Sequence, residues 1–80
     1  MNKAPYPNRE QLEALYAQRE AGVAALALQD RITAADVRSL DRIGRCKVAN
    51  EHWALCDEDA RQALRDDSHH FVRACADLAG

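Results

Sequence analysis

The sequence predicts an all-α fold, a small compact bundle of three to four short helices. Alanine accounts for 16 of the 80 residues, whereas aromatic residues make up only 5%. Alanine has the highest helix propensity, and β-strands favour the aromatic and β-branched residues that are scarce here. Apolar residues also recur three and four positions apart over most of the chain, which is the spacing of one helix face.

A tail precedes the first predicted helix. We expect residues 1–8 to form a flexible N-terminal tail, because Pro5 and Pro7 disfavour helical geometry. Asn8 is a typical N-cap, and the helix is expected to continue to about residue 28. The apolar stripe predicted along this helix consists of Leu12, Leu15, Tyr16, Val23, Leu26 and Ala27.

The second and third predicted helices meet near Gly44. Thr33 and Asp36 have the spacing of a capping box, so a second helix is predicted from Ala34 towards Gly44, a residue type common just after helix ends. The alternative is a helix that tolerates Gly44 and continues. The third segment carries apolar residues on two faces, which indicates a central and largely buried element. These residues are Cys46, Ala49, Trp53 and Cys56 on one face, and Val48 and Leu55 on the other.

The last predicted helix begins at Asp57 and has two further acidic residues in its first turn, where negative charge is favourable. Its expected core stripe consists of Ala60, Leu64, Phe71, Cys75 and Leu78. Asp67 would fall on this stripe if the helix were continuous. A break near Asp67, with Ser68 as a new N-cap, would remove the conflict, and both possibilities remain open.

The length and composition of the chain restrict its class. Residues 9–80 are expected to form a single helical domain. The formal net charge is −2 and no apolar run reaches the length of a membrane span, so we expect neither a generic nucleic-acid binder nor a membrane protein. Three cysteines without a C-x-x-C pair, and no secretory leader, favour reduced thiols in the cytoplasm.

Large apolar side chains are scarce. Leu, Ile, Val and Phe together supply only 15 of the 80 residues. A core built from so few large side chains favours close packing through alanine, or a second subunit that completes the core. We therefore expect a homodimer whose interface uses the first helix.

Charge is distributed in two poles along the chain. Residues 31–50 carry five basic and two acidic residues, whereas residues 51–80 carry three basic and seven acidic residues. The acidic pole suggests a surface for a basic partner, with candidate residues Asp57, Glu58, Asp59, Asp66 and Asp67. The basic pole suggests an arginine-lined helix face that contacts nucleic acid, with candidate residues Arg38, Arg42 and Arg45. Helix capping and ordinary solvated helix faces would explain both sets as well.

Metal binding and catalysis have weaker signals. His52 and Cys56 lie four residues apart and could share one ion on a helix, but the paired ligands of a structural zinc site are missing. We expect no cofactor. No nucleophile, base and orienting group stand at a recognisable spacing, and the three glycines form no phosphate loop, so we expect no enzymatic activity.

The expected function is stoichiometric protein binding. A small, acidic, cytoplasmic helical protein of this kind suits an inhibitor or adaptor that occupies a partner's surface. Phage or mobile-element accessory proteins that block host defence or nucleic-acid-handling complexes belong to this class. The alternatives are a regulatory protein that contacts nucleic acid through its arginines, and a Cys/His metal-binding domain.

Overall fold

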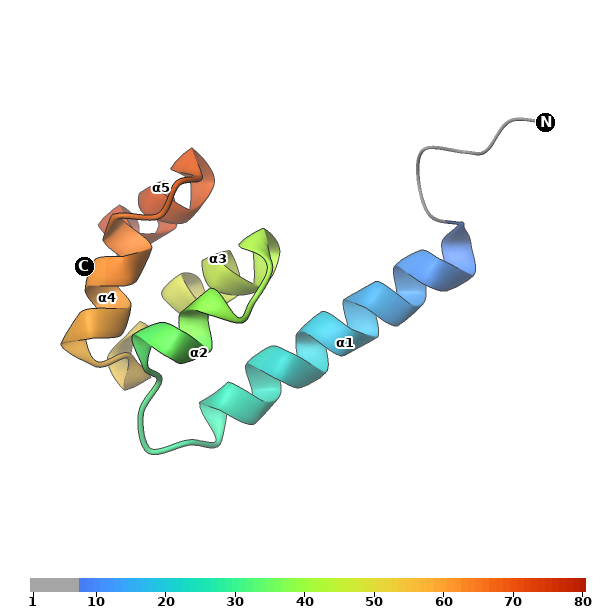
Figure 1. Cartoon of the computed structure of the whole chain (residues 1–80), viewed down its shortest axis with the longest axis horizontal. Helices are drawn as coiled ribbons and strands as arrows, with labels where there is room; N and C mark the ends of the chain where they lie inside the picture. Colours follow the sequence, from blue (N-terminus) through green and yellow to red (C-terminus); the bar gives the residue numbers. More distant parts are fainter. Residues whose placement is uncertain (1–7) are drawn as a thin grey trace.

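The computed structural model of the chain describes residues 8–80, and Figure 1 shows the arrangement of its helices. The helices are α1 (Arg9–Ala27), α2 (Ala34–Arg38), α3 (Arg42–Glu51), α4 (Glu58–Arg65) and α5 (His70–Ala79), with a 3-10 turn, η1 (Trp53–Leu55), between α3 and α4. No strand occurs within residues 8–80, so the predicted all-α class is confirmed. The bundle contains five helices, one of them only five residues long, in place of the expected three or four. Of the predicted tail, only Asn8 lies within the described residues.

Helix α3 is the centre of the fold. It contacts α1, α2, α4 and α5, whereas α1 packs on the rest of the protein mainly through α3. In Figure 1, α2 to α5 form a compact group, and the N-terminal half of α1 extends away from it. The central position agrees with the two apolar faces predicted for this segment. None of the helices in residues 8–80 has the length and apolarity needed to cross a membrane.

A small apolar core holds these helices together. Its fully buried large side chains are Ile32, Val37, Val48, Leu64 and Val72, and small residues such as Ala49, Ala60 and Ala76 fill the spaces between them. The loop before α2 is tied to η1 by backbone hydrogen bonds: the Ile32 N–H donates to the Leu55 carbonyl at 2.8 Å, and the Asp57 N–H donates to the Ile32 carbonyl at 2.9 Å. The buried alanines explain how a chain with few large apolar residues closes a core.

Three helix starts follow the local sequence signals. Asn8 forms a capping box with Gln11 at the start of α1, and Thr33 forms the predicted capping box with Asp36 at the start of α2. The Asp57 carboxylate accepts a hydrogen bond from the Ala60 N–H at 2.8 Å, which caps α4 as expected.

The predicted helix from Ala34 to Gly44 is wrong. Helix α2 ends at Arg38, and Asp41 caps a new helix by accepting a hydrogen bond from the Gly44 N–H at 2.7 Å. Gly44 therefore lies in the first turn of α3 and does not follow a helix end. A β-carbon on Gly44 would come within 3.2 Å of the Leu40 side chain and 3.1 Å of the Asp41 carboxylate, so the glycine permits this close approach.

The last helical region is broken near Asp67. Helix α4 ends at Arg65 and α5 begins at His70, but the cap is His69 in place of the suggested Ser68. Asp67 points inward, with only 9% of its side chain exposed, and its carboxylate pairs with Arg45 at 2.7 Å. The break also changes which residues of α5 face the core.

Two residues of the predicted core stripe are therefore on the surface. Phe71 and Leu78 are 59% and 87% exposed, and Val72 and Ala76 are buried instead. Counting helical periodicity from α4 through Asp67 gives the wrong phase for α5, because the non-helical residues between the helices reset it.

We expect Asp67→Ala to lower the free energy of unfolding by about 2–4 kcal/mol, because it leaves the half-buried Arg45 guanidinium without its carboxylate partner. Asp66→Ala, at the neighbouring exposed position, should change it by less than about 1 kcal/mol. Urea denaturation of the two variants and the parent chain measures both values. Equal effects of the two substitutions would contradict a structural role for the Arg45–Asp67 pair.

Candidate functional site

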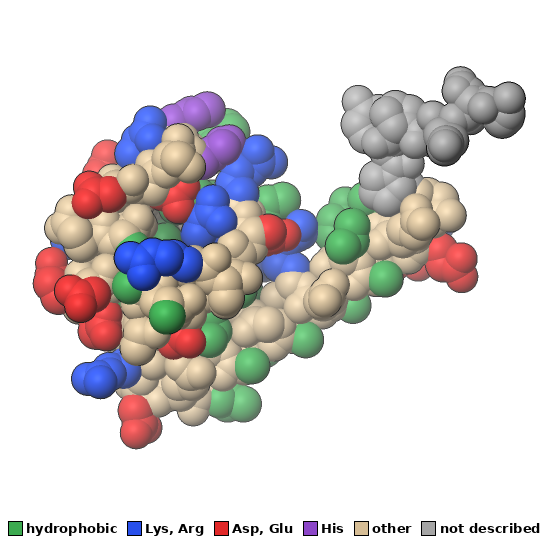
Figure 2. Space-filling view, viewed as in Figure 1, with side chains coloured by type: hydrophobic (Ala, Val, Ile, Leu, Met, Phe, Trp, Pro, Cys, Tyr) green, Lys and Arg blue, Asp and Glu red, His purple; other side chains and the backbone are tan. Residues whose placement is uncertain are grey.

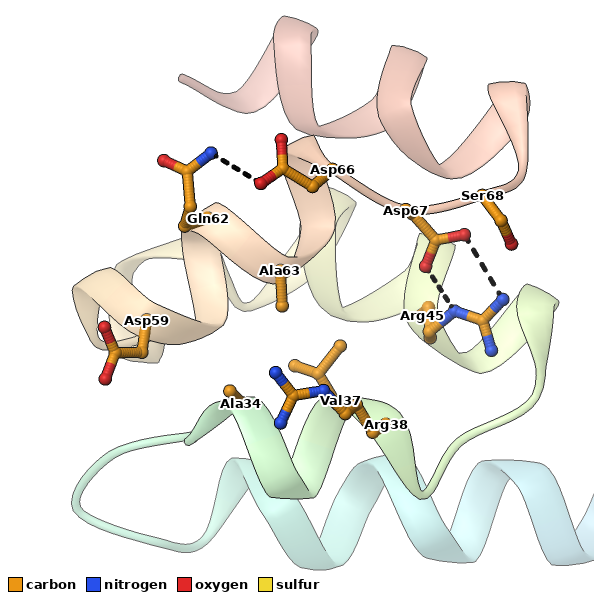
Figure 3. Close-up of a pocket in the computed structure, with 10 residues that line it drawn as sticks. All are labelled: Ala34, Val37, Arg38, Arg45, Asp59, Gln62, Ala63, Asp66, Asp67 and Ser68. Carbon is orange, nitrogen blue, oxygen red and sulfur yellow. Dashed lines mark hydrogen bonds and ion pairs between the residues drawn. The ribbon is translucent and has the colours of Figure 1, made fainter.

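A surface pocket of about 730 Å³ lies between α2, α4 and the turn that joins α4 to α5. Figure 3 shows its ten lining residues, which are Ala34, Val37, Arg38, Arg45, Asp59, Gln62, Ala63, Asp66, Asp67 and Ser68. The set includes two residues of the predicted basic pole and three of the predicted acidic pole. Charges that lie far apart in the sequence therefore meet at one place.

Helix α2 forms one wall of this pocket and α4 forms the facing wall. Ala34, Val37 and Ala63 are small or buried and provide an apolar floor between the two helices. The Arg38 side chain extends from α2 across this floor, and Figure 3 draws no hydrogen bond from its guanidinium to another lining residue. Its cationic group is free to meet a ligand.

The inner end of the pocket is closed by the Arg45–Asp67 pair. The Arg45 Nε and Nη2 atoms donate to the two Asp67 oxygens at 2.7 and 3.4 Å, and Nη1 donates to the Leu40 carbonyl at 2.8 Å. Asp67 also accepts a hydrogen bond from the His69 N–H at 2.9 Å. These contacts occupy both side chains, so neither contributes a free charge to the pocket.

Two exposed carboxylates border the pocket on the α4 side. Asp66 accepts a hydrogen bond from the Gln62 amide at 3.0 Å, and Asp59 bonds to none of the other lining residues. Asp59, Gln62, Ala63 and Asp66 are spaced three, four and seven residues apart, which places them on one side of α4. The sequence shows this spacing, but it does not show that α2 forms the facing wall of the pocket.

The five predicted acidic residues do not form one free surface. Asp57 caps α4, Glu58 pairs with Arg65 at 3.1 Å and Asp67 pairs with Arg45. Asp59 and Asp66 are the two whose exposed carboxylates lie at the edge of the pocket without an ion-pair partner among its lining residues.

The three predicted arginines do not line one helix. Arg38 is the last residue of α2, whereas Arg42 and Arg45 belong to α3. Arg45 is held by Asp67, and the Arg42 guanidinium lies 3.1 Å from the Nε2 atom of His69. Asp41, next to Arg42 in the sequence, pairs with Arg19 of α1 at 2.9 Å.

The weakly suggested metal ligands do not converge. The Cys56 thiol donates to the His52 carbonyl at 3.6 Å, so the two residues meet through a backbone atom. Within residues 8–80, His, Cys, Asp and Glu side chains form no group of three that could hold an ion. Burial raises the pKa of the Cys56 thiol, and burial and the neighbouring Cys75 raise that of Cys46. Raised thiol pKa values are typical of structural cysteines.

A second candidate surface is the N-terminal half of α1. Val23 and Leu26 at the other end of the predicted stripe are buried, but Leu15 and Tyr16 are 48% and 50% exposed. Figure 2 shows hydrophobic side chains along this projecting half of the helix. A single apolar stripe thus begins as an exposed surface and ends in the core.

A smaller pocket of about 350 Å³ lies where α1 leaves the rest of the protein. Leu15, Arg19 and Leu40 are among its lining residues. The ion pair of Arg19 with Asp41 fixes the helix at this point and lowers the pKa of the Asp41 carboxyl. The projecting half of α1 is therefore held in a defined direction.

Three consecutive aromatic rings form an exposed stack at the start of α5. The ring centroids of His69 and His70 are 4.9 Å apart, and those of His70 and Phe71 are 4.6 Å apart. The Nδ1 atom of His69 accepts the Phe71 N–H at 3.2 Å and so caps α5. Both His69 nitrogens face donors, one from Phe71 and one from Arg42, an arrangement that disfavours the protonated ring.

Comparison with protein-family models, with curated proteins and with solved structures finds no match for the chain.

Acidification is expected to destabilise the protein through His69. Partial burial, and then the Arg42 guanidinium, lower the pKa of His69; His70 and Arg45 act in the same direction and Asp67 opposes them. As the pH falls, the unfolded chain takes up this proton before the folded chain does. The stability that the neutral ring contributes is therefore complete above about pH 6.5 and is lost as the pH falls towards the lower folded-state pKa.

The free energy of unfolding, measured by urea denaturation between about pH 7.5 and 5, should fall for the parent chain. His69→Asn retains a good N-cap that does not titrate, so its decrease should be smaller. His70→Asn is the matched control and should retain most of the parent's pH dependence. Identical profiles for the parent and His69→Asn would show that His69 does not link folding to pH.

Proposed function

We propose that the protein is a stoichiometric protein-binding module, an inhibitor or adaptor, that docks on its partner through the projecting half of α1. The observation that carries this proposal is the exposure of Leu15 and Tyr16 on the stripe that buries Val23 and Leu26 further along the same helix. An amphipathic helix presenting such a stripe is a common way to fill an apolar groove on another protein.

The energetics favour a protein partner for this surface. Leu15 and Tyr16 are about half exposed, so burying the exposed part of each side chain would contribute about 1 kcal/mol or more to the free energy of binding. Tyrosine is also enriched at the energetic centres of interfaces. The ion pair between Arg19 and Asp41 holds the helix before binding, so less conformational entropy is lost on association.

Charged groups border the stripe and would form the rim of such an interface. Arg9 pairs with Glu13 at 3.3 Å near the free end of α1, and Glu20 pairs with Lys47 of α3 at 3.0 Å near the base. Exposed pairs of this kind add little affinity, but they oppose partners whose charges do not match. The acidic pole is less suited to this role than α1, because capping and ion pairing use three of its five candidate residues.

The same stripe would serve a second copy of the chain, and the proposed homodimer is one form of this interface. The small core, with five fully buried large side chains, supports a gain in stability from such an association. A partner of a different sequence would compete with self-association for the same residues.

Replacing Leu15 and Tyr16 together by serine is expected to remove the apolar contact and weaken partner binding at least tenfold. Ala17→Ser with Ala21→Ser, two exposed positions on the opposite side of α1, should leave binding unchanged. Light scattering measures self-association against the 8.9 kDa mass of one chain. For another partner, co-purification from the native host identifies the protein, and titration with the purified partner gives the affinity of each variant.

Circular dichroism of both double variants checks that α1 remains folded. Loss of binding in the Leu15 and Tyr16 variant alone supports the proposal. Equal binding by all three chains, or equal loss in both double variants, would contradict it.

A further inference from the structure

We infer that the pocket between α2 and α4 binds a small basic zwitterion, a ligand with one carboxylate and two cationic groups separated by an aliphatic stem, as in free arginine or lysine. This inference goes beyond the proposed protein-binding function. It uses none of the residues of the α1 surface, so either proposal can fail without the other.

The charges that remain free in the pocket define the ligand. Arg45 and Asp67 neutralise each other at its inner end. What remains is one cation, Arg38, and two carboxylates, Asp59 and Asp66, all exposed. A ligand with one carboxylate and two cations is the direct electrostatic complement of this set.

The positions of these groups match the same ligand. Asp59 and Asp66 are seven residues apart along α4 and its C-cap, a separation of two helical turns or roughly 10 Å. Carboxylates so far apart cannot share one ion, but they can each bind one end of an extended chain that carries a cation at both ends. Figure 3 shows the Arg38 guanidinium on the facing wall, where it can bind a carboxylate bidentately.

The floor of the pocket suits an aliphatic stem. Ala34 and Ala63 present methyl groups between the charged walls, and the buried Val37 lies beneath them. Methylene chains of basic amino acids pack on apolar surface of this kind while their charged ends reach polar partners. Gln62 and Ser68 add polar groups at the edge, although the Gln62 amide already donates to Asp66 at 3.0 Å.

Other ligand classes fit the pocket less well. A phosphate or nucleic-acid backbone would meet Arg38 but would also be repelled by Asp59 and Asp66. A purely cationic ligand would satisfy the two carboxylates and be repelled by Arg38. The two opposite requirements are met together by a zwitterion.

The inference is tested by titrating the ¹⁵N-labelled full chain with L-arginine and following the amide resonances of the pocket residues. Agmatine, which lacks the carboxylate, and L-citrulline, which lacks the side-chain cation, are the comparison probes. L-arginine should shift amide signals of Arg38, Asp59 and Ala63 in a saturable way and bind more tightly than either comparison probe.

Two variants separate the roles of the walls. Asp59→Asn should weaken binding of both L-arginine and agmatine, about twofold to fivefold, as for a partly exposed ion pair. Arg38→Gln should weaken the binding of L-arginine by a similar factor. The same substitution should leave the binding of agmatine unchanged or make it tighter. The matched controls Asp77→Asn and Arg31→Gln remove charges outside the pocket and should have no effect.

A peptide that ends in arginine, Gly-Gly-Arg, distinguishes the source of the ligand. It keeps the guanidinium and the carboxylate but moves the amino group away. Binding equal to that of L-arginine would show that the α-ammonium group is not recognised and would overturn the two-cation ligand, whereas weaker binding would support the free amino acid. Absence of saturable shifts with L-arginine, or equal weakening by the control variants, would overturn the inference.

Discussion

One guanidinium group, that of Arg45, holds together two of the turns that interrupt the helical chain. It donates to the Leu40 carbonyl in the turn between α2 and α3, and to the Asp67 carboxylate in the turn between α4 and α5. Asp67 in turn accepts the His69 N–H next to the start of α5. Because α3 is the helix that contacts all the others, Arg45 links the turn after α2 to the turn after α4 across the centre of the fold. A planar group with several donors is suited to join two backbone segments in this way.

The pocket exists because of this arrangement. Arg45 draws the turn after α4 towards α3, and α2 then faces α4 across a floor of small residues. The ion pair also neutralises the two inner charges, so the free charges of the pocket are those of Arg38, Asp59 and Asp66. The basic and acidic poles of the sequence are thus partly used for folding and partly presented together at one surface.

Helix α1 combines structural and interacting roles along its length. Its C-terminal half contributes Val23 and Leu26 to the core, and its N-terminal half continues the same stripe into solvent. The boundary between the halves is marked by the ion pair of Arg19 with Asp41, the residue that also caps α3. Orientation of the projecting half is therefore coupled to the start of the central helix.

The sequence by itself determined the all-α class and the starts of α1, α2 and α4. These features depend on local chemistry: alanine propensity, and the side chains of Asn8, Thr33 and Asp57, which each accept a hydrogen bond from the backbone N–H three residues further on. The stripe of α1 was also visible, because its apolar residues recur at helical spacing on both sides of Arg19. The exposure of the first half of this stripe could not be predicted, because periodicity shows which residues share a face and not what covers that face.

Only the tertiary structure decided where the remaining helices break and which charges are free. The turn after α4 is held by the contact of Arg45 with Asp67, which spans 22 residues, and no local pattern reports such a contact. The same break shifts the phase of α5, so that Phe71 is exposed and Val72 is buried. The candidate pocket follows from these long-range contacts, because its walls come from α2 and α4, which the chain brings together only when the core closes.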